Sequence, residues 1–177
     1  MAMLISSLFY LFIGLIFLQK LLLEYFSQLV TACTLIIVAL GSNLWYYAIE
    51  EVFMSHVFNF SLISVFLYHV LHKKASYNGY KWWLIFGILI GLISLVRPTN
   101  VLVLIIPLLY QRARLTLLIK QNLIPIVCSI AIAILIWIPQ LIYWKTQTGS
   151  LFFFSYGEEG FNLLQPEIWK GLFGGKR

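Results

Sequence analysis

Polar side chains recur at every fourth position in one otherwise apolar part of the sequence. Glu51, Ser55 and Asn59 are four residues apart, and His56 lies beside them. Residues four apart are neighbours on one face of a helix. Polar side chains that continue into an apolar helix are costly unless they face a cavity or a partner. We therefore predict that this face lines a cavity together with Arg97; the alternative is a polar packing face between helices.

Arg97 is a second candidate functional residue. It opens the turn Arg97-Pro98-Thr99-Asn100 between two apolar stretches. A guanidinium group can bind a carboxylate or a phosphate through two parallel hydrogen bonds, whereas a lysine offers only a point charge. We predict that Arg97 contacts a phosphate, and the alternative is that it simply anchors the turn at the membrane interface.

A third candidate is the acidic segment Tyr156-Gly157-Glu158-Glu159-Gly160-Phe161-Asn162. Glycines around two acids and aromatic residues suggest an ordered loop, in which a carboxylate could act as a base, hold a divalent cation or bind sugar hydroxyls. A solvated acidic turn is the alternative. No metal-ligand spacing such as His-Glu-x-x-His occurs, so we predict no metal site and no cofactor beyond that optional cation.

The composition decides what kind of protein carries these residues. The chain has 177 residues, of which 62% are hydrophobic and 10% are charged. Soluble domains are roughly 45–50% apolar and about 25% charged, so a soluble domain is excluded, as is a disordered chain. The net charge is +6, but no basic stripe is large enough for nucleic acid. A nucleotide-phosphate loop is also absent. What remains is a multispanning membrane protein.

The charge-free stretches predict an all-α, polytopic bundle of about six transmembrane helices, because a hydrocarbon core needs roughly 20 helical residues. The predicted spans are 2–19, 27–49, 53–72, 82–96, 98–111 and 122–144. The fourth and fifth are short and could form one long helix carrying Arg97 in mid-membrane. Pro98 disfavours helical geometry in the residue before it, which favours two short helices.

Basic residues fix the predicted orientation, because they accumulate in cytoplasmic loops. The gaps after the first, third and fifth spans contain seven basic residues, and the other gaps contain one, Arg97. The seven are Lys20, Lys73, Lys74, Lys81, Arg112, Arg114 and Lys120. Glu50, Glu51, Arg97 and the truncated loop 145–177 are therefore expected on the non-cytoplasmic side. This orientation also puts residue 1 outside and leaves no closing span, so we expect a fragment of a larger protein.

Five short motifs come in a recognisable order. They are Gly41-Ser42-Asn43-Leu44-Trp45-Tyr46-Tyr47, Met54-Ser55-His56, Arg97-Pro98-Thr99-Asn100, Tyr143-Trp144 and Tyr156-Gly157-Glu158-Glu159-Gly160-Phe161. This order resembles that of bacterial multispanning glycosyltransferases of the GT-C superfamily, such as protein O-mannosyltransferases and lipid A aminoarabinose transferases. The resemblance covers most of the chain.

The resemblance implies transfer of a sugar from a polyprenyl-phosphate donor to a lipid or glycan acceptor at the outer face of the bacterial plasma (inner) membrane. It implies membrane lipids as further partners and no nucleic acid. Such enzymes need a carboxylate to deprotonate or orient the acceptor and a cation to stabilise the leaving phosphate. The candidate catalytic residues are Glu51, Glu158 and Glu159, and the candidate substrate ligands are Arg97, His56, Asn59 and Tyr156.

The sequence departs from the superfamily in one respect. The usual catalytic acid is an aspartate in the first outer loop, and this chain contains no aspartate. Its first span would then correspond to a later helix of the family, the base is unassigned, and we expect the chain alone to be inactive. A transporter or flippase for a lipid-linked glycan and a non-catalytic membrane subunit are the alternatives; polar groups clustered at the outer ends of the spans favour an enzyme over a transporter.

Overall fold

A computed structural model describes residues 1–72, 77 and 79–152 of the chain. Every regular element in this described part is helical, as the sequence predicts. The chain divides into two compact units, Met1–Gln140 and Leu141–Arg177. The predicted site residues Tyr156, Glu158 and Glu159 lie outside the described residues.

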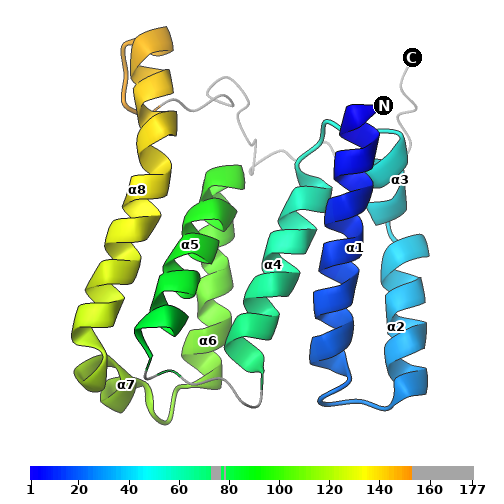
Figure 1. The fold of residues 1–177 in the computed structure, drawn as a ribbon, viewed down its shortest axis with the longest axis horizontal. Coiled ribbons are helices and arrows are strands. Elements are labelled where there is room, and N and C mark those ends of the chain that lie inside the picture. Colours follow the sequence, from blue (N-terminus) through cyan, green and yellow to red (C-terminus); the bar gives the residue numbers. More distant parts are fainter. Residues whose placement is uncertain (73–76, 78, 153–177) are drawn as a thin grey trace, which may run out of the picture. The chain divides into compact units, whose positions relative to one another are not determined.

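The helices follow one another with short connections (Figure 1). In chain order they are α1 Ala2–Leu22, α2 Gln28–Leu40, α3 Leu44–Ile49, α4 His56–Leu71, α5 Tyr80–Val96, the 3-10 helix η1 Pro98–Leu104, α6 Ile105–Tyr110, α7 Leu115–Gln121 and α8 Leu123–Thr148. Within the first unit, the helices leave two groups of connections. We call the group formed by 41–55 and 97–100 the Arg97 end, and the group formed by 23–27, 71–72 and 110–114 the Tyr25 end.

Helices α1 and α4 pack closely because α1 carries a glycine at their contact. A Cβ atom added to Gly14 would lie 2.6 Å from the Phe60 ring and 3.0 Å from the Ser61 Cα atom. Small residues let helix backbones approach where no hydrophobic effect drives helices together, as within a membrane. Gly14 therefore brings α4, and with it the polar face that begins at Ser55, against α1.

One apolar core cluster of the first unit lies between α4 and α5, and another lies between α1, α3 and α4. Phe66 and Val70 of α4 are fully buried against Leu89, Ile90 and Ile93 of α5. These positions recur at helical spacing on both helices, so one stripe of each helix faces the other. The contact holds the two helix ends that bear Ser55 and Arg97 next to each other.

Two glycines of α5 allow α8 to approach. A Cβ atom on Gly87 would lie 2.5 Å from the Ser129 carbonyl oxygen, and one on Gly91 would lie 3.1 Å from the Ala133 Cα atom. The Trp137 indole also donates a hydrogen bond to Ser94 Oγ over 2.9 Å. The small-xxx-small spacing of Gly87 and Gly91 thus meets a matching pair of small residues on α8.

The predicted span 27–49 is divided in the structure. Helix α2 ends at Leu40 and α3 begins at Leu44. Ser42 stabilises the break, because its hydroxyl donates to the Val38 carbonyl oxygen at 2.6 Å and accepts from the Leu44 amide at 3.2 Å. A serine that satisfies backbone groups in this way competes with continuation of the helix.

Membrane character follows from the length and composition of the helices. Within the described residues, α1 and α8 are each long and apolar enough to cross a membrane. A third span results if Pro98–Tyr110 and Leu115–Gln121 are counted together, although these two segments are bent by 105°. Helices α2, α4 and α5 are apolar but shorter. Two or three candidate spans are therefore found, and the six-span arrangement remains a proposal.

The described part of the second unit contains the last turns of α8 and residues 149–152. Helix α8 ends at Thr148, and Gly149 follows with a φ of 76°. Its amide donates to the Lys145 carbonyl oxygen over 3.1 Å. A left-handed glycine directly after a helix is a common way to satisfy the last carbonyl groups.

Candidate functional site

The backbone at Arg97 positions its side chain at the end of α5. Arg97 is extended, with φ −149° and ψ 121°, and Pro98 begins the next helix. A proline at this position needs no hydrogen-bond acceptor for its nitrogen, and it restricts the residue before it to extended geometry. The Asn100 amide closes the turn by donating to the Arg97 carbonyl oxygen over 2.9 Å.

The Arg97 guanidinium reaches the first residues of α4. Its Nε atom donates to Ser55 Oγ at 3.3 Å, and its Nη2 atom lies 3.5 Å from His56 Nε2. An arginine has five N–H donors, and these two contacts use only part of them. The Arg97 side chain is exposed, so its remaining donors can reach a ligand.

His56 is held in place by an aromatic neighbour. Its ring stacks on Tyr47 of α3, with ring centroids 4.1 Å apart and ring planes inclined by 29°. The same ring faces Arg97 through Nε2, which can accept from the guanidinium only while that nitrogen is unprotonated. The cluster of Tyr47, Ser55, His56 and Arg97 therefore joins α3 and the start of α4 to the end of α5; we call it the Arg97 cluster.

Asn59 lies one turn further along α4 and has a different partner. Its Oδ1 atom accepts a 2.8 Å hydrogen bond from Asn100 Nδ2, which also lies 3.4 Å from the Ile93 carbonyl oxygen. This pair connects α4 with the turn that presents Arg97. The Asn59 amide oxygen is thus used within the protein, which favours a positioning role over the predicted substrate contact.

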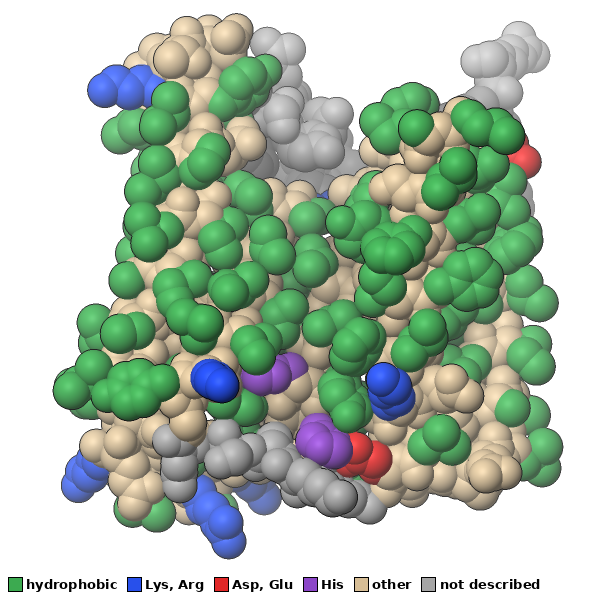
Figure 2. Space-filling view, viewed as in Figure 1, with side chains coloured by type: hydrophobic (Ala, Val, Ile, Leu, Met, Phe, Trp, Pro, Cys, Tyr) green, Lys and Arg blue, Asp and Glu red, His purple; other side chains and the backbone are tan. Residues whose placement is uncertain are grey.

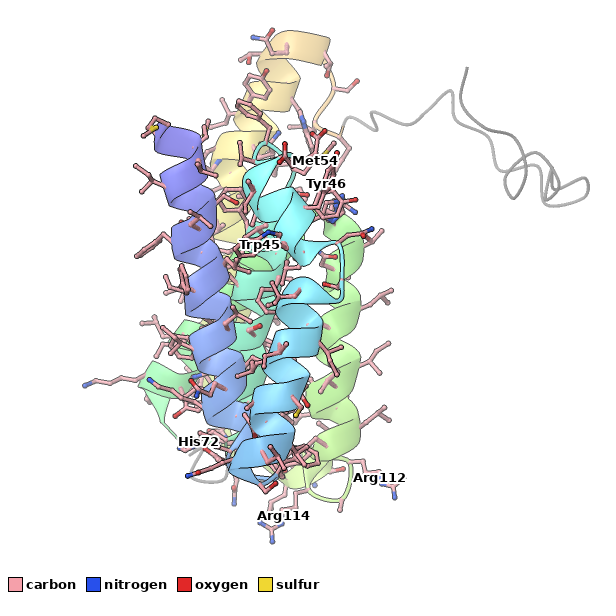
Figure 3. All side chains as sticks on the ribbon, turned by 90° about the vertical axis from the view of Figure 1, so that its right-hand side faces the viewer. Trp45, Tyr46, Met54, His72, Arg112 and Arg114 are labelled. Carbon is pink, nitrogen blue, oxygen red and sulfur yellow. The ribbon has the colours of Figure 1, made fainter. Side chains whose placement is uncertain are left out.

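No carboxylate neutralises the Arg97 cluster within the described part of the chain. The ion pair between Glu24 and His72 is the one found there, and it involves other residues. Glu51 lies at the same end of the first unit, where the Tyr46 hydroxyl is 3.5 Å from its Oε1 atom. Figure 3 labels Tyr46 and Met54 at this end. The described surroundings of Arg97 leave the cluster with net positive charge, which suits an anionic ligand.

The structure brings some predicted site residues together and not others. Arg97 and His56 are in contact, and Asn59 is linked to the Arg97 turn through Asn100. Glu51 makes no ion pair with Arg97. Because α4 begins at His56, Glu51 precedes the helix and does not share the predicted helical face with Ser55 and Asn59. Tyr47 and Asn100 are the contributors for which the sequence predicted no individual role. Both belong to the quoted motifs, but a motif does not reveal which helix its side chains will face.

A metal centre has no support in the described residues, where no group of three His, Cys, Asp or Glu side chains is close enough to hold an ion. The acidic segment around Glu158 is outside the described residues, so the optional divalent cation is untested.

The Tyr25 end carries a second polar cluster. Glu24 pairs with His72 at the end of α4, and the Tyr25 hydroxyl donates to the Leu71 carbonyl oxygen. The Tyr110 hydroxyl lies 3.3 Å from that of Tyr25. This hydrogen bond, with a smaller contribution from burial, raises the pKa of Tyr25 to about 12. The cluster connects the α1–α2 connection with α4 and α6, which indicates a structural role.

Comparison with protein-family models, with curated proteins and with solved structures found no match for this chain.

Proposed function

We propose that the Arg97 cluster binds the phosphate of a polyprenyl-phosphate-linked sugar, and that the chain is the donor-binding part of a GT-C-like membrane glycosyltransferase. The observation that carries the proposal is the Arg97 guanidinium, which is exposed, is held by the neutral Ser55 hydroxyl and by His56, and has no carboxylate counter-ion among the described residues. Arginine is well suited to binding phosphate through paired hydrogen bonds.

The electrostatic task in such a transfer is to stabilise the phosphate as it leaves the sugar. Negative charge develops on the leaving oxygen, and a preorganised cation stabilises that charge. In this proposal, the contacts from Ser55 and His56 fix the guanidinium in advance, and the Asn59–Asn100 hydrogen bond fixes the turn beneath it. Glu51, Glu158 and Glu159 are the candidates for the carboxylate that deprotonates or orients the acceptor.

The proposed setting is a bacterial plasma membrane crossed six times, with the Arg97 end on the non-cytoplasmic side. The distribution of basic residues supports this orientation. Helices α2, α4 and α5 are apolar along their length but shorter than a typical span. Short spans are accommodated by local thinning of the bilayer or by association with other helices.

Photo-crosslinking tests the proposal. Proteoliposomes containing the chain are irradiated with a photoreactive polyprenyl-phosphate sugar, and the crosslinked peptides are identified by mass spectrometry. We expect crosslinks near Ser55 and Arg97 that are lost in Arg97→Ala and partly kept in Arg97→Lys. Crosslinks that survive Arg97→Ala unchanged would argue against the site.

The same proteoliposomes distinguish a glycosyltransferase from the main alternative, a flippase. A flippase for a lipid-linked glycan would move a fluorescent donor between leaflets, and the rate would be measured by quenching from outside. The glycosyltransferase proposal predicts donor binding without accelerated movement. Rapid translocation would instead favour the transporter.

A further inference from the structure

The chain between α6 and α8 forms a basic elbow at the Tyr25 end, comprising residues 111–121. Helix α7 is bent by 105° from the preceding segment Pro98–Tyr110. If that segment follows the membrane normal, α7 lies nearly in the plane of the membrane surface. Short helices in this orientation commonly rest at the interface between lipid tails and headgroups.

The elbow is ordered by hydrogen bonds of its own. The Arg114 amide donates to the Gln111 carbonyl oxygen over 2.8 Å, which forms the turn before α7. At the other end of α7, the buried Asn122 side chain donates to the Leu118 carbonyl oxygen over 3.0 Å. These contacts stabilise the turn before α7 and the end of α7.

The side chains of the elbow combine two properties. Arg112, Arg114 and Lys120 are exposed, and Figure 3 shows Arg112 and Arg114 pointing away from the helices at the lower end of the molecule. Leu117 and Ile119 are also exposed, at 54% and 44%. Apolar side chains next to basic ones match a bilayer interface, where the first enter the acyl region and the second meet headgroups.

The charge of the elbow is not balanced by any carboxylate in the part of the chain that the structure describes. No acidic residue occurs between Glu51 and Glu158 in the sequence. Among the described residues, no carboxylate lies within ion-pair distance of Arg112, Arg114 or Lys120. Figure 2 shows Lys and Arg side chains projecting at the lower end, below a broad band of hydrophobic side chains.

We propose that the basic elbow docks on the membrane leaflet at the Tyr25 end and binds the headgroups of anionic phospholipids there. Three cations without an ion-pair partner among the described residues provide the charge complementarity, and Leu117 with Ile119 provides the anchorage in the interface. This interaction is independent of sugar transfer, because it uses residues at the opposite end of the first unit from Arg97.

Spin-labelled lipids test the proposal in the full chain reconstituted into vesicles of phosphatidylcholine. The ratio of association of spin-labelled phosphatidylglycerol to spin-labelled phosphatidylcholine is measured by electron paramagnetic resonance. Since each basic residue near an anionic surface contributes about 1 kcal/mol, or roughly fivefold, we expect the selectivity to fall at least about fivefold when Arg112, Arg114 and Lys120 are all changed to glutamine.

Matched variants make the outcome specific to the elbow. Lys20→Gln combined with Lys81→Gln removes exposed charges from other helices and should leave most of the selectivity. The double variant Arg112→Lys with Arg114→Lys should keep the lipid selectivity. Binding of a headgroup at the surface depends more on positive charge than on the paired hydrogen bonds of a planar guanidinium group. Equal losses from the Lys20/Lys81 variant and the elbow variant would overturn the proposal. A competition experiment in which the basic elbow binds polyprenyl phosphate in preference to phosphatidylglycerol would also overturn the proposal.

Discussion

Arg97 and Ser55 are 42 positions apart in the chain, yet the Arg97 Nε atom donates to the Ser55 Oγ atom over 3.3 Å. This contact joins the end of α5 to the start of α4. It depends on the buried contact of Phe66 and Val70 with Ile93, which sets α4 beside α5. The core thus determines where the guanidinium is held, and the following predictions test successive parts of that arrangement.

The first prediction concerns the packing of α5 on α8. Gly87→Ala would place a Cβ atom 2.5 Å from the Ser129 carbonyl oxygen, so the helices must separate. Overpacking of this kind typically costs about 1–3 kcal/mol. We expect Gly87→Ala to lower the midpoint of thermal unfolding in detergent. Tryptophan fluorescence measures the unfolding.

Gly79→Ala is the matched control, because among the described residues no atom beyond the chain neighbours lies within 4 Å of a Cβ at that position. It should leave the midpoint close to that of the wild type. Equal midpoints for Gly87→Ala and Gly79→Ala would mean that α5 and α8 do not pack as described.

The second prediction distinguishes two roles for Asn59. If Asn59 positions the Arg97 turn through Asn100, Asn59→Ala and Asn100→Ala should each reduce stability and should be non-additive in the double variant. Hydrogen bonds between membrane helices contribute about 0.6 kcal/mol on average. Thermal unfolding of the four proteins measures the coupling. A loss of donor affinity in Asn59→Ala alone, with additive stabilities, would instead make Asn59 a substrate ligand.

The third prediction is an alkaline weakening of the Tyr25 end. The pKa of Tyr25 is raised from 10.0 to about 12, chiefly by its hydrogen bond with Tyr110. A raised pKa means that folding favours the protonated phenol. Its stabilising contribution is complete below pH 10.0 and is lost as the pH rises through about 12.

Comparison of wild type with Tyr25→Phe isolates this effect from other titrating groups. The difference between their unfolding midpoints should shrink across that pH window, because phenylalanine has no proton to lose. Tyr110→Phe should behave in the same way, since it removes the same hydrogen bond. A pH-independent difference between wild type and Tyr25→Phe would contradict the assignment.

The fourth prediction is the orientation in the membrane. Single cysteines at Ser42 and at Arg114 are introduced into a chain whose exposed Cys33 and Cys128 have been changed to serine. A membrane-impermeant maleimide added to intact cells should label position 42 and should label position 114 only after the membrane is broken. Labelling of position 114 in intact cells would show that the topology is the reverse of the one predicted.

Part of this arrangement was predictable from the sequence alone. Composition predicted an all-helical membrane protein, and Pro98 marked the end of α5 because it restricts Arg97 to extended geometry. The break between α2 and α3 was missed, because the stretch 27–49 contains no charge and hydropathy does not register a serine that caps a turn. Helix α7 was missed for the opposite reason, since Arg112, Arg114 and Lys120 made its region look like a loop.

The site was predictable to a similar extent. Helical spacing predicted one face with Glu51, Ser55 and Asn59, and topology placed Arg97 at the same end. Helix α4 begins only at His56, so Ser55 is its N-cap residue and Glu51 precedes the helix. Spacing could not show that Asn59 would pair with Asn100 over 41 positions, because that contact depends on the register of α4 against η1. The Glu24–His72 pair was hidden for the same reason, as it joins residues 48 positions apart.

The most direct test of the central claim is the affinity of the purified chain for polyprenyl phosphate compared with the matching polyprenol, measured in detergent by thermophoresis. A charge-assisted hydrogen bond to phosphate contributes about 1.5–3 kcal/mol, so the wild type should prefer the phosphate by roughly ten- to a hundredfold. Arg97→Ala should remove this preference, Arg97→Lys should restore part of it, and Lys20→Ala should leave it intact. A full preference for the phosphate in Arg97→Ala, or none in the wild type, would contradict the account.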